Sequence, residues 1–239
     1  MKHHTMNLAK GMLRIGGISI IERQINTIKK IDTPKIIIVR GYRAQDINFP
    51  YIENIRYYTN EDYANTNMVA SLMKARSEFT EDISVSYGDI LYNYEMLRDI
   101  LTFPDDFVVA VDVKWKKYWK MRYDQIEHDT ESLKIGKEGN IIQLGTSNPP
   151  IEEIDARYIG LLKFSRKALS IMEDIYDSNE RWKTAYMTDM LQEVIDRGYP
   201  VFAVPFENGW IEFDTAEDYK KNTNWFNNES LLRQLNLKL

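Results

Sequence analysis

Cysteine is absent from the 239-residue sequence, and histidine occurs only three times. Without cysteine, the chain has no disulfide framework, no thiolate metal site and no thiol nucleophile. Two of the three histidines are His3 and His4, so His128 is the one remaining candidate for an imidazole base. The sequence therefore argues against zinc chemistry and against a histidine-based mechanism.

An excess of positive charge and long apolar runs are also missing. The formal charge is −5, whereas a nucleic-acid-binding protein normally has a basic face. No apolar run approaches the roughly 18 residues of a membrane span, and the amino end lacks the apolar core of a signal peptide. We therefore expect a cytoplasmic protein that binds no nucleic acid and has no membrane span.

The composition, 44% hydrophobic and 28% charged, is that of a globular α/β protein with a substantial core. In the first half, apolar runs alternate with amphipathic segments. Strands are predicted at residues 35–42, 55–58, 83–87 and 107–112, and helices at 19–30, from 66 or 67 onward, and at 94–101. This alternation predicts a mainly parallel sheet with right-handed crossovers.

The second half of the chain does not continue the regular alternation of strands and helices. It predicts a hairpin over 133–144, a strand at 158–164, helices at 166–175 and 187–197, a strand at 201–204, and a short helix at 231–239. Thr215 and Asp218 form a capping box at the start of one more helix. We expect one domain over 1–222, with an acceptor-binding lobe of about 113–157 inserted, and a tail or short helix over 223–239.

An apolar run breaks at Gly88 and Asp89, which makes this stretch a candidate site. In an open α/β sheet, ligands bind in the crevice beyond the carboxyl ends of the strands. Gly88 lets the backbone approach a ligand closely, and Asp89 offers a carboxylate to a Mg²⁺ ion bound to phosphate oxygens. The alternative interpretation is an ordinary turn aspartate after a core strand.

Asp214 has the same kind of position as Asp89, at the end of a strand just before Thr215. Mg²⁺ takes only one or two protein carboxylates and fills its other positions with water and substrate phosphate oxygens. Two such aspartates could share one Mg²⁺ in a phosphoryl or nucleotidyl transfer site. Alternatively, Asp214 is simply part of a helix start.

Seven short motifs together resemble one family. They are KGMLRIGG (10–17), IIERQI (20–25), VRGY (39–42), NTNMVASL (65–72), SYGDILY (86–92), YIGLLKFS (158–165) and WIEFDT (210–215). In order and spacing the chain is similar to phosphocholine cytidylyltransferase-like nucleotidyltransferases. The resemblance implies a Rossmann-like nucleotidyltransferase fold with a mixed, mostly parallel sheet. It also implies transfer of CMP from CTP to a small phosphorylated or phosphonylated acceptor, such as phosphocholine or 2-aminoethylphosphonate, with release of pyrophosphate.

The resemblance assigns roles to particular residues. Asp89 and Asp214 resemble the family's Mg²⁺ ligands, and Lys10 resembles the lysine that binds nucleotide phosphates. Asn67 and Ser71 resemble residues placed to contact base or ribose. Gly88 is assigned to the same nucleotide-binding site. In-line attack on an α-phosphate needs positioning and charge neutralisation rather than a protein nucleophile, which suits a chain without cysteine.

The acceptor site is predicted from the stretch VKWKKYWKMRY at 113–123. Aromatic faces at Trp115 and Trp119 could cage an ammonium by cation-π attraction, while nearby lysines could hold a phosphate. Glu131 and Asp189 resemble family positions that line this pocket, and each is equally compatible with a surface or cap residue. Rival interpretations of 113–123 are packing on the neighbouring lobe and an interfacial basic helix.

Two further functions compete with a Mg²⁺-dependent cytidylyltransferase. One is a sugar-1-phosphate nucleotidylyltransferase using UTP or dTTP, and the other is a non-catalytic nucleotide-binding relative. The sequence leaves the acceptor open, and it also leaves open whether the protein forms a homodimer.

A last expectation concerns the amino end. In the family, the stretch equivalent to Lys10 is preceded by a buried strand and a loop of the form LAAGxGxR, whose backbone N–H groups close around a triphosphate. Only nine residues precede Lys10 here, and none is glycine. We expect a start codon placed too late or a truncated chain, with an exposed strand edge, poor CTP binding and little turnover. The alternative is a degenerate relative.

Overall fold

The structure is a computed structural model that describes residues 8–31 and 34–238. The strands are β1 (Arg14–Ile15), β2 (Ile18–Ser19), β3 (Ile36–Arg40), β4 (Ile55–Thr59), β5 (Ile83–Ser86), β6 (Ile90–Tyr92), β7 (Phe107–Asp112), β8 (Glu131–Ile135), β9 (Ile141–Ser147), β10 (Arg157–Phe164), β11 (Phe202–Phe206) and β12 (Trp210–Glu212). The α-helices are α2 (Ile20–Ile28), α3 (Met68–Met73), α4 (Tyr94–Thr102), α5 (Trp115–Arg122), α6 (Arg166–Ser178), α7 (Met187–Asp196), α8 (Ala216–Phe226) and α9 (Glu229–Gln234). Short 3-10 turns are η1 (Lys10–Met12), η2 (Ala44–Asp46), η3 (Arg76–Glu78), η4 (Ile151–Glu153) and η5 (Glu180–Lys183).

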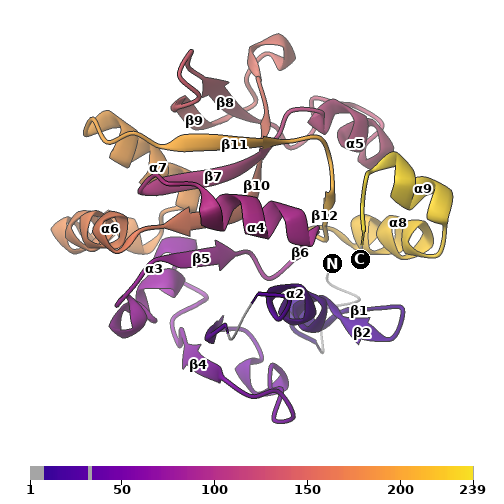
Figure 1. The fold of residues 1–239 in the computed structure, drawn as a ribbon, viewed down its shortest axis with the longest axis horizontal. Coiled ribbons are helices and arrows are strands. Elements are labelled where there is room, and N and C mark those ends of the chain that lie inside the picture. Colours follow the sequence, from indigo (N-terminus) through magenta and orange to yellow (C-terminus); the bar gives the residue numbers. More distant parts are fainter. Residues whose placement is uncertain (1–7, 32–33, 239) are drawn as a thin grey trace.

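The central sheet has four strands in the order β11-β7-β10-β5 (Figure 1). β11 runs parallel to β7, whereas β10 runs antiparallel to both β7 and β5. The chain leaves β7 at Asp112 and re-enters the sheet at Arg157, directly opposite Asp112. Because the inserted lobe leaves and returns at the same end, β10 must run backwards, and the sheet is mixed, as predicted.

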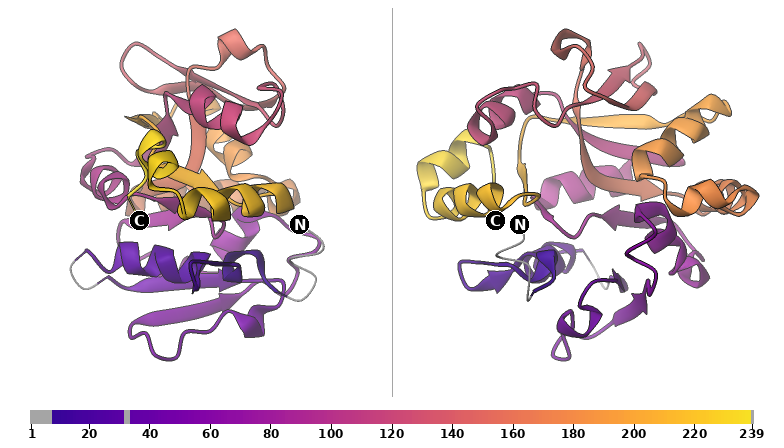
Figure 2. Two further views of the ribbon diagram at one scale, coloured as in Figure 1. Left: turned by 90° about the vertical axis from the view of Figure 1, so that its right-hand side faces the viewer. Right: turned by 180° about the vertical axis from the view of Figure 1, so that it is seen from behind.

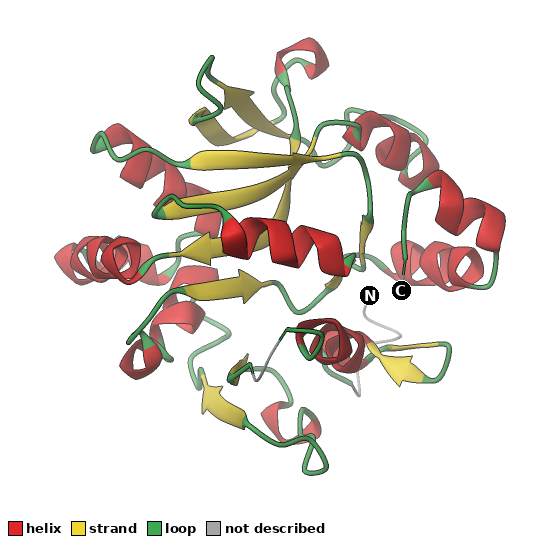
Figure 3. Ribbon diagram, viewed as in Figure 1, coloured by secondary structure: helices red, strands yellow, loops and turns green. Residues whose placement is uncertain are grey.

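The two faces of β7 belong to two different cores. Val108 and Ala110 lie in one cluster with Met96, Leu97 and Ile100 of α4. The alternate residues Phe107, Val109 and Val111 lie in the other cluster, with apolar residues of α6 and α7. Side chains alternate between the faces of a strand, so this fully buried run requires helices on both sides (Figure 3).

The β8–β9 hairpin and the β3–β4 pair lie at opposite ends of the molecule (Figure 2). The predicted hairpin is confirmed, and β3 and β4 form a separate parallel pair. Within residues 8–31 and 34–238, β3 pairs only with β4, and β5 pairs only with β10. The β3–β4 pair is therefore parallel, as the alternation predicts, but among the described residues it is not hydrogen-bonded to the central sheet. The expectation about the amino end concerns residues outside the described ones and stays a prediction.

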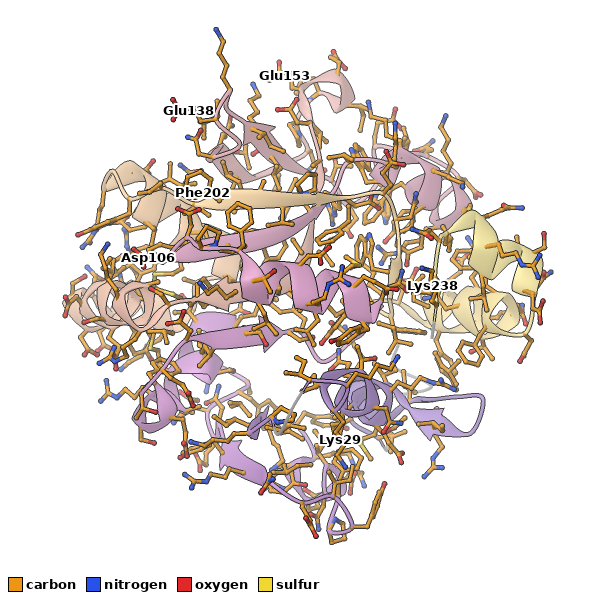
Figure 4. The ribbon with its side chains drawn as sticks, viewed as in Figure 1. Lys29, Asp106, Glu138, Glu153, Phe202 and Lys238 are labelled. Carbon is orange, nitrogen blue, oxygen red and sulfur yellow. The ribbon has the colours of Figure 1, made fainter. Side chains whose placement is uncertain are left out.

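The carboxyl-terminal segment packs into the core, and the expected domain boundary at 222 falls inside α8. Asn222 is a buried residue inside α8, and Leu235 and Leu237 pack into the same cluster as α4. The Asn93 side chain donates to the carbonyl of Asn236 at 2.7 Å and accepts from the Lys238 backbone N–H at 2.6 Å. Figure 4 labels Lys238 beside the amino end of α4.

Most predicted helices and strands are present, with ends shifted by a few residues. Asn67 is the N-cap of α3, and Thr215 and Asp218 form the predicted capping box of α8. Asp32 and Thr33, expected at the end of α2, lie outside the described residues. Among the described residues, none of the helices has the length and apolar character needed to cross a membrane.

One buried carboxylate holds the β3–β4 pair against the chain that follows α3. Glu78 is only 5% exposed, accepts hydrogen bonds from Arg56 Nη1 at 2.8 Å and Tyr58 at 2.6 Å, and forms an ion pair with Lys35. Lys35, Tyr58 and Arg56 together lower the pKa of Glu78 from 4.5 to about 2. The charged form is therefore stabilised by folding.

We predict that Glu78→Gln lowers the free energy of unfolding at pH 7 and that the deficit shrinks at pH 3. The folded-state pKa lies below the unfolded one, so the stabilisation is present above the unfolded value of 4.5 and is lost as pH falls toward about 2. Urea titrations at both pH values measure it. Glu61→Gln is the control, since Glu61 is 77% exposed in its ion pair with Lys74. An equal deficit at both pH values would contradict the prediction.

Candidate active site

Asp89 and Asp214 lie together because two short strands pair (Figure 1). β6 begins directly after Asp89, and β12 ends two residues before Asp214. The strands are antiparallel, with Ile90 opposite Glu212. The ladder continues beyond them, since the Phe213 backbone N–H donates to the Asp89 carbonyl at 2.8 Å. The pairing of β6 with β12 therefore sets the distance between the two carboxylates.

Lys10 bridges the two aspartates. Its Nζ lies 2.9 Å from Asp89 Oδ2 and 2.9 Å from Asp214 Oδ1. The three side chains are 34%, 27% and 52% exposed, respectively, so the group is open to solvent. Burial lowers the pKa of Lys10, but the charges and hydrogen bonds of Asp89 and Asp214 outweigh it and raise the pKa above 10.5. The three predicted catalytic residues thus form one cluster.

A glycine allows Lys10 to reach this position. A Cβ on Gly11 would lie 2.8 Å from the carbonyl oxygen of Gly88 and 2.6 Å from the Ile21 side chain. A larger residue would therefore push the Lys10 segment away from the turn that contains Asp89. At Gly88 itself, a Cβ would meet nothing within 4 Å. The predicted role of Gly88 in nucleotide binding stays a prediction.

Arg122 holds the segment that contains Asp214. Arg122 is buried, and it donates from Nε and Nη2 to the two oxygens of Asp218 at 2.6 and 2.8 Å. Its third nitrogen forms an ion pair with Glu212. Asp218 in turn accepts from the backbone N–H of Thr215 at 2.7 Å. Glu212 and Asp218 flank Asp214 in the chain, so Arg122 fixes the segment on both sides.

A tyrosine pair lies next to the cluster. The Tyr158 hydroxyl donates to the Tyr87 hydroxyl at 3.0 Å, and Tyr87 precedes Asp89 by two residues. Burial raises the pKa of Tyr87, and the charges of Glu131 and Asp89 raise it further. Glu131, predicted to bind the acceptor, therefore lies within electrostatic reach of the same tyrosine as Asp89.

Asn67 and Ser71, predicted to contact the nucleotide, already have partners in the fold. Asn67 accepts from the Met68 backbone N–H at 2.9 Å as a helix cap, and Ser71 accepts from Asn60 at 3.1 Å. Among the described residues, neither is hydrogen-bonded to the lysine–aspartate cluster. Their role in nucleotide binding stays a prediction.

The rings of Trp115 and Trp119, predicted to form an aromatic cage, lie in the core, and their role in acceptor binding stays a prediction. Trp115 is 1% exposed and Trp119 is 0% exposed, and both belong to the core cluster around α4. The ring of Trp119 already has the guanidinium carbons of Arg122 at 4.9 Å and Arg157 at 4.3 Å. The alternating lysines and aromatics come from a helix whose aromatic side packs inward, which is the packing alternative.

Asp189 has a capping role as well as a place near the predicted acceptor site. It accepts from the Tyr186 backbone N–H at 2.8 Å at the start of α7. It also lies close enough for its charge to raise the pKa of Glu131, although burial is the larger cause. The predicted role of Glu131 and Asp189 in lining the acceptor pocket stays a prediction.

Sequence reasoning missed Arg122, Arg157 and the Tyr87–Tyr158 pair. Arg122 stands in the predicted basic helix, but only the fold reveals that it is buried among carboxylates. Arg157 starts β10 directly after Ala156, which is itself buried, and a charged residue at the edge of an apolar run was a signal available in the sequence. Tyr87 lies in the motif SYGDILY (86–92), and Tyr158 lies in the motif YIGLLKFS (158–165).

A mixed α/β sheet with two carboxylates beyond its strands and a lysine between them is the arrangement of a nucleotidyltransferase. No protein-family model matches the chain. CTP:phosphoglutamine cytidylyltransferase of Campylobacter jejuni is 30% identical over 231 residues, with 90% of each chain covered. The chain therefore belongs to the nucleotidyltransferase family that includes the phosphocholine cytidylyltransferase-like enzymes.

Two more comparisons agree with this assignment. Choline-phosphate cytidylyltransferase of Streptococcus pneumoniae is 24% identical over 232 residues, which cover 95% of this chain and 93% of that one. The solved structure of the inositol-1-phosphate CTP transferase from T. maritima matches with a TM-score of 0.73 at 16% identity, covering 96% of this chain and 91% of that one. At this identity the structural likeness supports the Rossmann-like fold alone.

We predict that Trp115→Ala and Trp119→Ala each lower the free energy of unfolding by about 3 to 5 kcal/mol, the usual cost of truncating a buried aromatic residue. Urea titration measures the loss. Tyr51→Ala is the control, because Tyr51 is 68% exposed and should lose little. Unchanged stability, together with a selective loss of acceptor affinity, would contradict this prediction and support the aromatic-cage hypothesis.

Proposed function

We propose that this protein is a Mg²⁺-dependent cytidylyltransferase that transfers CMP from CTP to a small phosphorylated or phosphonylated acceptor and releases pyrophosphate. The observation that supports this most directly is the Lys10 ammonium held 2.9 Å from both Asp89 and Asp214. The cluster lies beside strand ends and contains two carboxylates, one ammonium and no nucleophile. Such a cluster suits charge neutralisation on phosphates.

The two curated relatives support the nucleotide and the reaction class. Both act as cytidylyltransferases, one on phosphoglutamine and one on choline phosphate. Their acceptors share a phosphoryl group and differ at the other end, which is an amino acid in one and a quaternary ammonium in the other. We therefore assign CTP and a phosphoryl or phosphonyl acceptor, without taking the acceptor's far end from either relative.

The residues fit a Mg²⁺ site. One cation, the Lys10 ammonium, already contacts both carboxylates, so Asp89 and Asp214 are close enough to share another. Across residues 8–31 and 34–238, the structure contains no group of three or more histidine, cysteine or carboxylate side chains placed to hold a metal ion. A two-carboxylate site is what Mg²⁺ uses when substrate phosphates and water complete its shell. When bound there, it would neutralise phosphate charge during the transfer.

The reaction needs little from the protein beyond position and charge. An acceptor phosphoryl oxygen attacks the α-phosphorus of CTP, and the bond from that phosphorus to the bridging oxygen breaks. The electron pair leaves with pyrophosphate. Lys10 is placed to neutralise the triphosphate, and Asp89 and Asp214 would hold the cation that accompanies it. Arg122 contributes indirectly by fixing the segment around Asp214.

No general base is required for this attack. A phosphate monoester has a second pKa near 6, so the attacking oxygen is already ionised at neutral pH. This explains how a chain without cysteine, and without a histidine beside Asp89 and Asp214 in its described part, could still catalyse the transfer.

Product analysis by mass spectrometry tests the proposal. The chain, and any longer in-frame product of its gene, would be incubated with each of four nucleoside triphosphates, Mg²⁺ and a panel of acceptors. We expect a CMP-linked product and pyrophosphate with CTP. Products from UTP or dTTP with a sugar 1-phosphate would instead identify a sugar-nucleotide enzyme. No product from any combination would favour a non-catalytic relative.

We predict that Asp89→Asn and Asp214→Asn each lower kcat by about a hundredfold or more, since each removes a carboxylate that would hold the cation neutralising the reacting phosphates. Melting temperature should change little because both side chains are partly exposed. Asp177→Asn, in an exposed ion pair with Arg76, is the control. Near wild-type turnover of either variant at saturating Mg²⁺ would refute the shared-cation site.

We predict that Lys10→Met raises the affinity for Mg²⁺ in the absence of nucleotide and lowers the affinity for CTP. Lys10 now forms ion pairs with both aspartates, so its removal leaves two unpaired carboxylates for one divalent cation. Isothermal titration with MgCl₂ alone, then with CTP, measures both effects. Lys29→Met on exposed surface is the control. If Mg²⁺ affinity stayed the same, Lys10 would not compete for that position.

A further inference from the structure

Two arginines pack against the same indole, and they differ in their acidic partners. The guanidinium of Arg122 lies 4.9 Å and that of Arg157 lies 4.3 Å from the ring centre of Trp119. Arg122 is neutralised by the bidentate pair with Asp218 and the ion pair with Glu212. This comparison within one molecule makes the state of Arg157 unusual.

Arg157 is buried without adequate compensation. Its side chain is 12% exposed, and its buried Nη1 has no hydrogen-bond partner among the described residues. Its nearest acid is Asp129, at 3.6 Å from Nη2, which is longer than a hydrogen bond, and Asp129 is itself 48% exposed. An unsatisfied charged donor in a buried position is costly. It suggests a site where a ligand supplies the missing acceptor.

A carboxylate of the protein lies near Arg157 but does not satisfy it. Burial raises the pKa of Glu131, and the positive charge of Arg157 opposes that shift. Burial likewise lowers the pKa of Arg157, opposed by Asp129 and Glu131. Among the described residues, no ion pair joins Glu131 to Arg157. The Arg157 guanidinium and the Glu131 carboxylate are thus close to each other but form no ion pair in the described part of the chain. They would suit a ligand that has a carboxylate for Arg157 and an ammonium for Glu131.

The pair is connected to the lysine–aspartate cluster through the tyrosines. Arg157 precedes Tyr158 in β10, the Tyr158 hydroxyl donates to Tyr87 at 3.0 Å, and Tyr87 is two residues from Asp89. From the other side, Trp119 packs against Arg122, which holds the chain around Asp214. Tyr87 lies within electrostatic reach of both Glu131 and Asp89, so the pair and the cluster lie near the same tyrosine.

Resting on the proposed cytidylyltransferase function, we propose that Arg157 binds a carboxylate of the acceptor while Glu131 binds its ammonium. The acceptor is then a phosphorylated or phosphonylated amino acid, and its phosphoryl end lies toward Lys10, Asp89 and Asp214. The planar guanidinium fork matches a carboxylate with two parallel hydrogen bonds. The buried indoles of Trp115 and Trp119 leave no open ring face for a quaternary ammonium, which disfavours a choline head.

Matched phosphonates test the proposal by binding alone, without CTP. The compounds 2-amino-4-phosphonobutanoate and 3-aminopropylphosphonate differ only in the carboxylate, and so do 2-amino-5-phosphonopentanoate and 4-aminobutylphosphonate. Isothermal titration would give a dissociation constant for each. We expect at least one carboxylate-bearing member to bind about tenfold or more tightly than its partner, the usual effect of a charge-assisted pair of hydrogen bonds.

Two substitutions separate the roles of the charges. Arg157→Gln should weaken only the carboxylate-bearing members and reduce the preference to below about twofold. Glu131→Gln should weaken both members of a pair equally, because both contain the ammonium. Should Arg157→Gln fold poorly by thermal melting, Arg157→Lys keeps the charge but loses the planar fork, and should keep only part of the preference.

Arg181→Gln is the matched control. Arg181 also packs on an indole, that of Trp182 at 4.4 Å, and pairs with Glu193 at 3.0 Å, but it is 62% exposed and far from this pair in the chain. It should leave every affinity unchanged. Equal affinities within both pairs for the wild-type protein, or an equal loss for both members in Arg157→Gln, would overturn the inference. Absence of CMP transfer with preserved pair preference would instead reject only the proposed function.

Discussion

The buried contact between Arg122 and Asp218 is the interaction on which the active site depends. It joins α5, at the start of the inserted lobe, to α8, which begins two residues after Asp214. Removing one partner of a buried ion pair leaves an uncompensated charge, and the cost is typically about 3 to 5 kcal/mol. Because Glu212 shares the same guanidinium, the chain cannot move Asp214 without also breaking this network. The geometry of the carboxylate thus rests on charges that never contact substrate.

The same indole packs against two arginines that have different surroundings. Trp119 gives both Arg122 and Arg157 an apolar, polarisable surface. The surroundings then differ, because Arg122 meets two carboxylates and Arg157 meets one distant, half-exposed acid. Burial alone does not mark function. A buried charge becomes informative when the protein supplies its desolvation but not its partner, as it does for Arg157.

The sequence could predict those features that depend on neighbours in the chain. Asp89 follows Gly88 at the end of an apolar run, and Thr215 precedes Asp218 at capping-box spacing, so both were predictable from local patterns. The pairing of β6 with β12 was not, because three-residue strands give little periodicity and their register depends on packing far along the chain. For Trp115 and Trp119, residue type suggested a cage, whereas helical phase and the fold put both rings inside. Resemblance grouped Lys10 with the aspartates, and the bridging distances needed the structure.

Charge balance in the cluster couples the events of the proposed reaction. One ammonium now faces two carboxylates, and the same ammonium is the group placed to contact the triphosphate. Lys10 can neutralise phosphate only by giving up some of its contact with Asp89 and Asp214, and two carboxylates left beside a polyanion would repel it. A cation that arrives with the nucleotide removes this conflict, since it satisfies the aspartates as Lys10 turns to the phosphates. In the proposed reaction the lysine would pair with the carboxylates in the free protein, and it would become available for the nucleotide once Asp89 and Asp214 hold a metal cation.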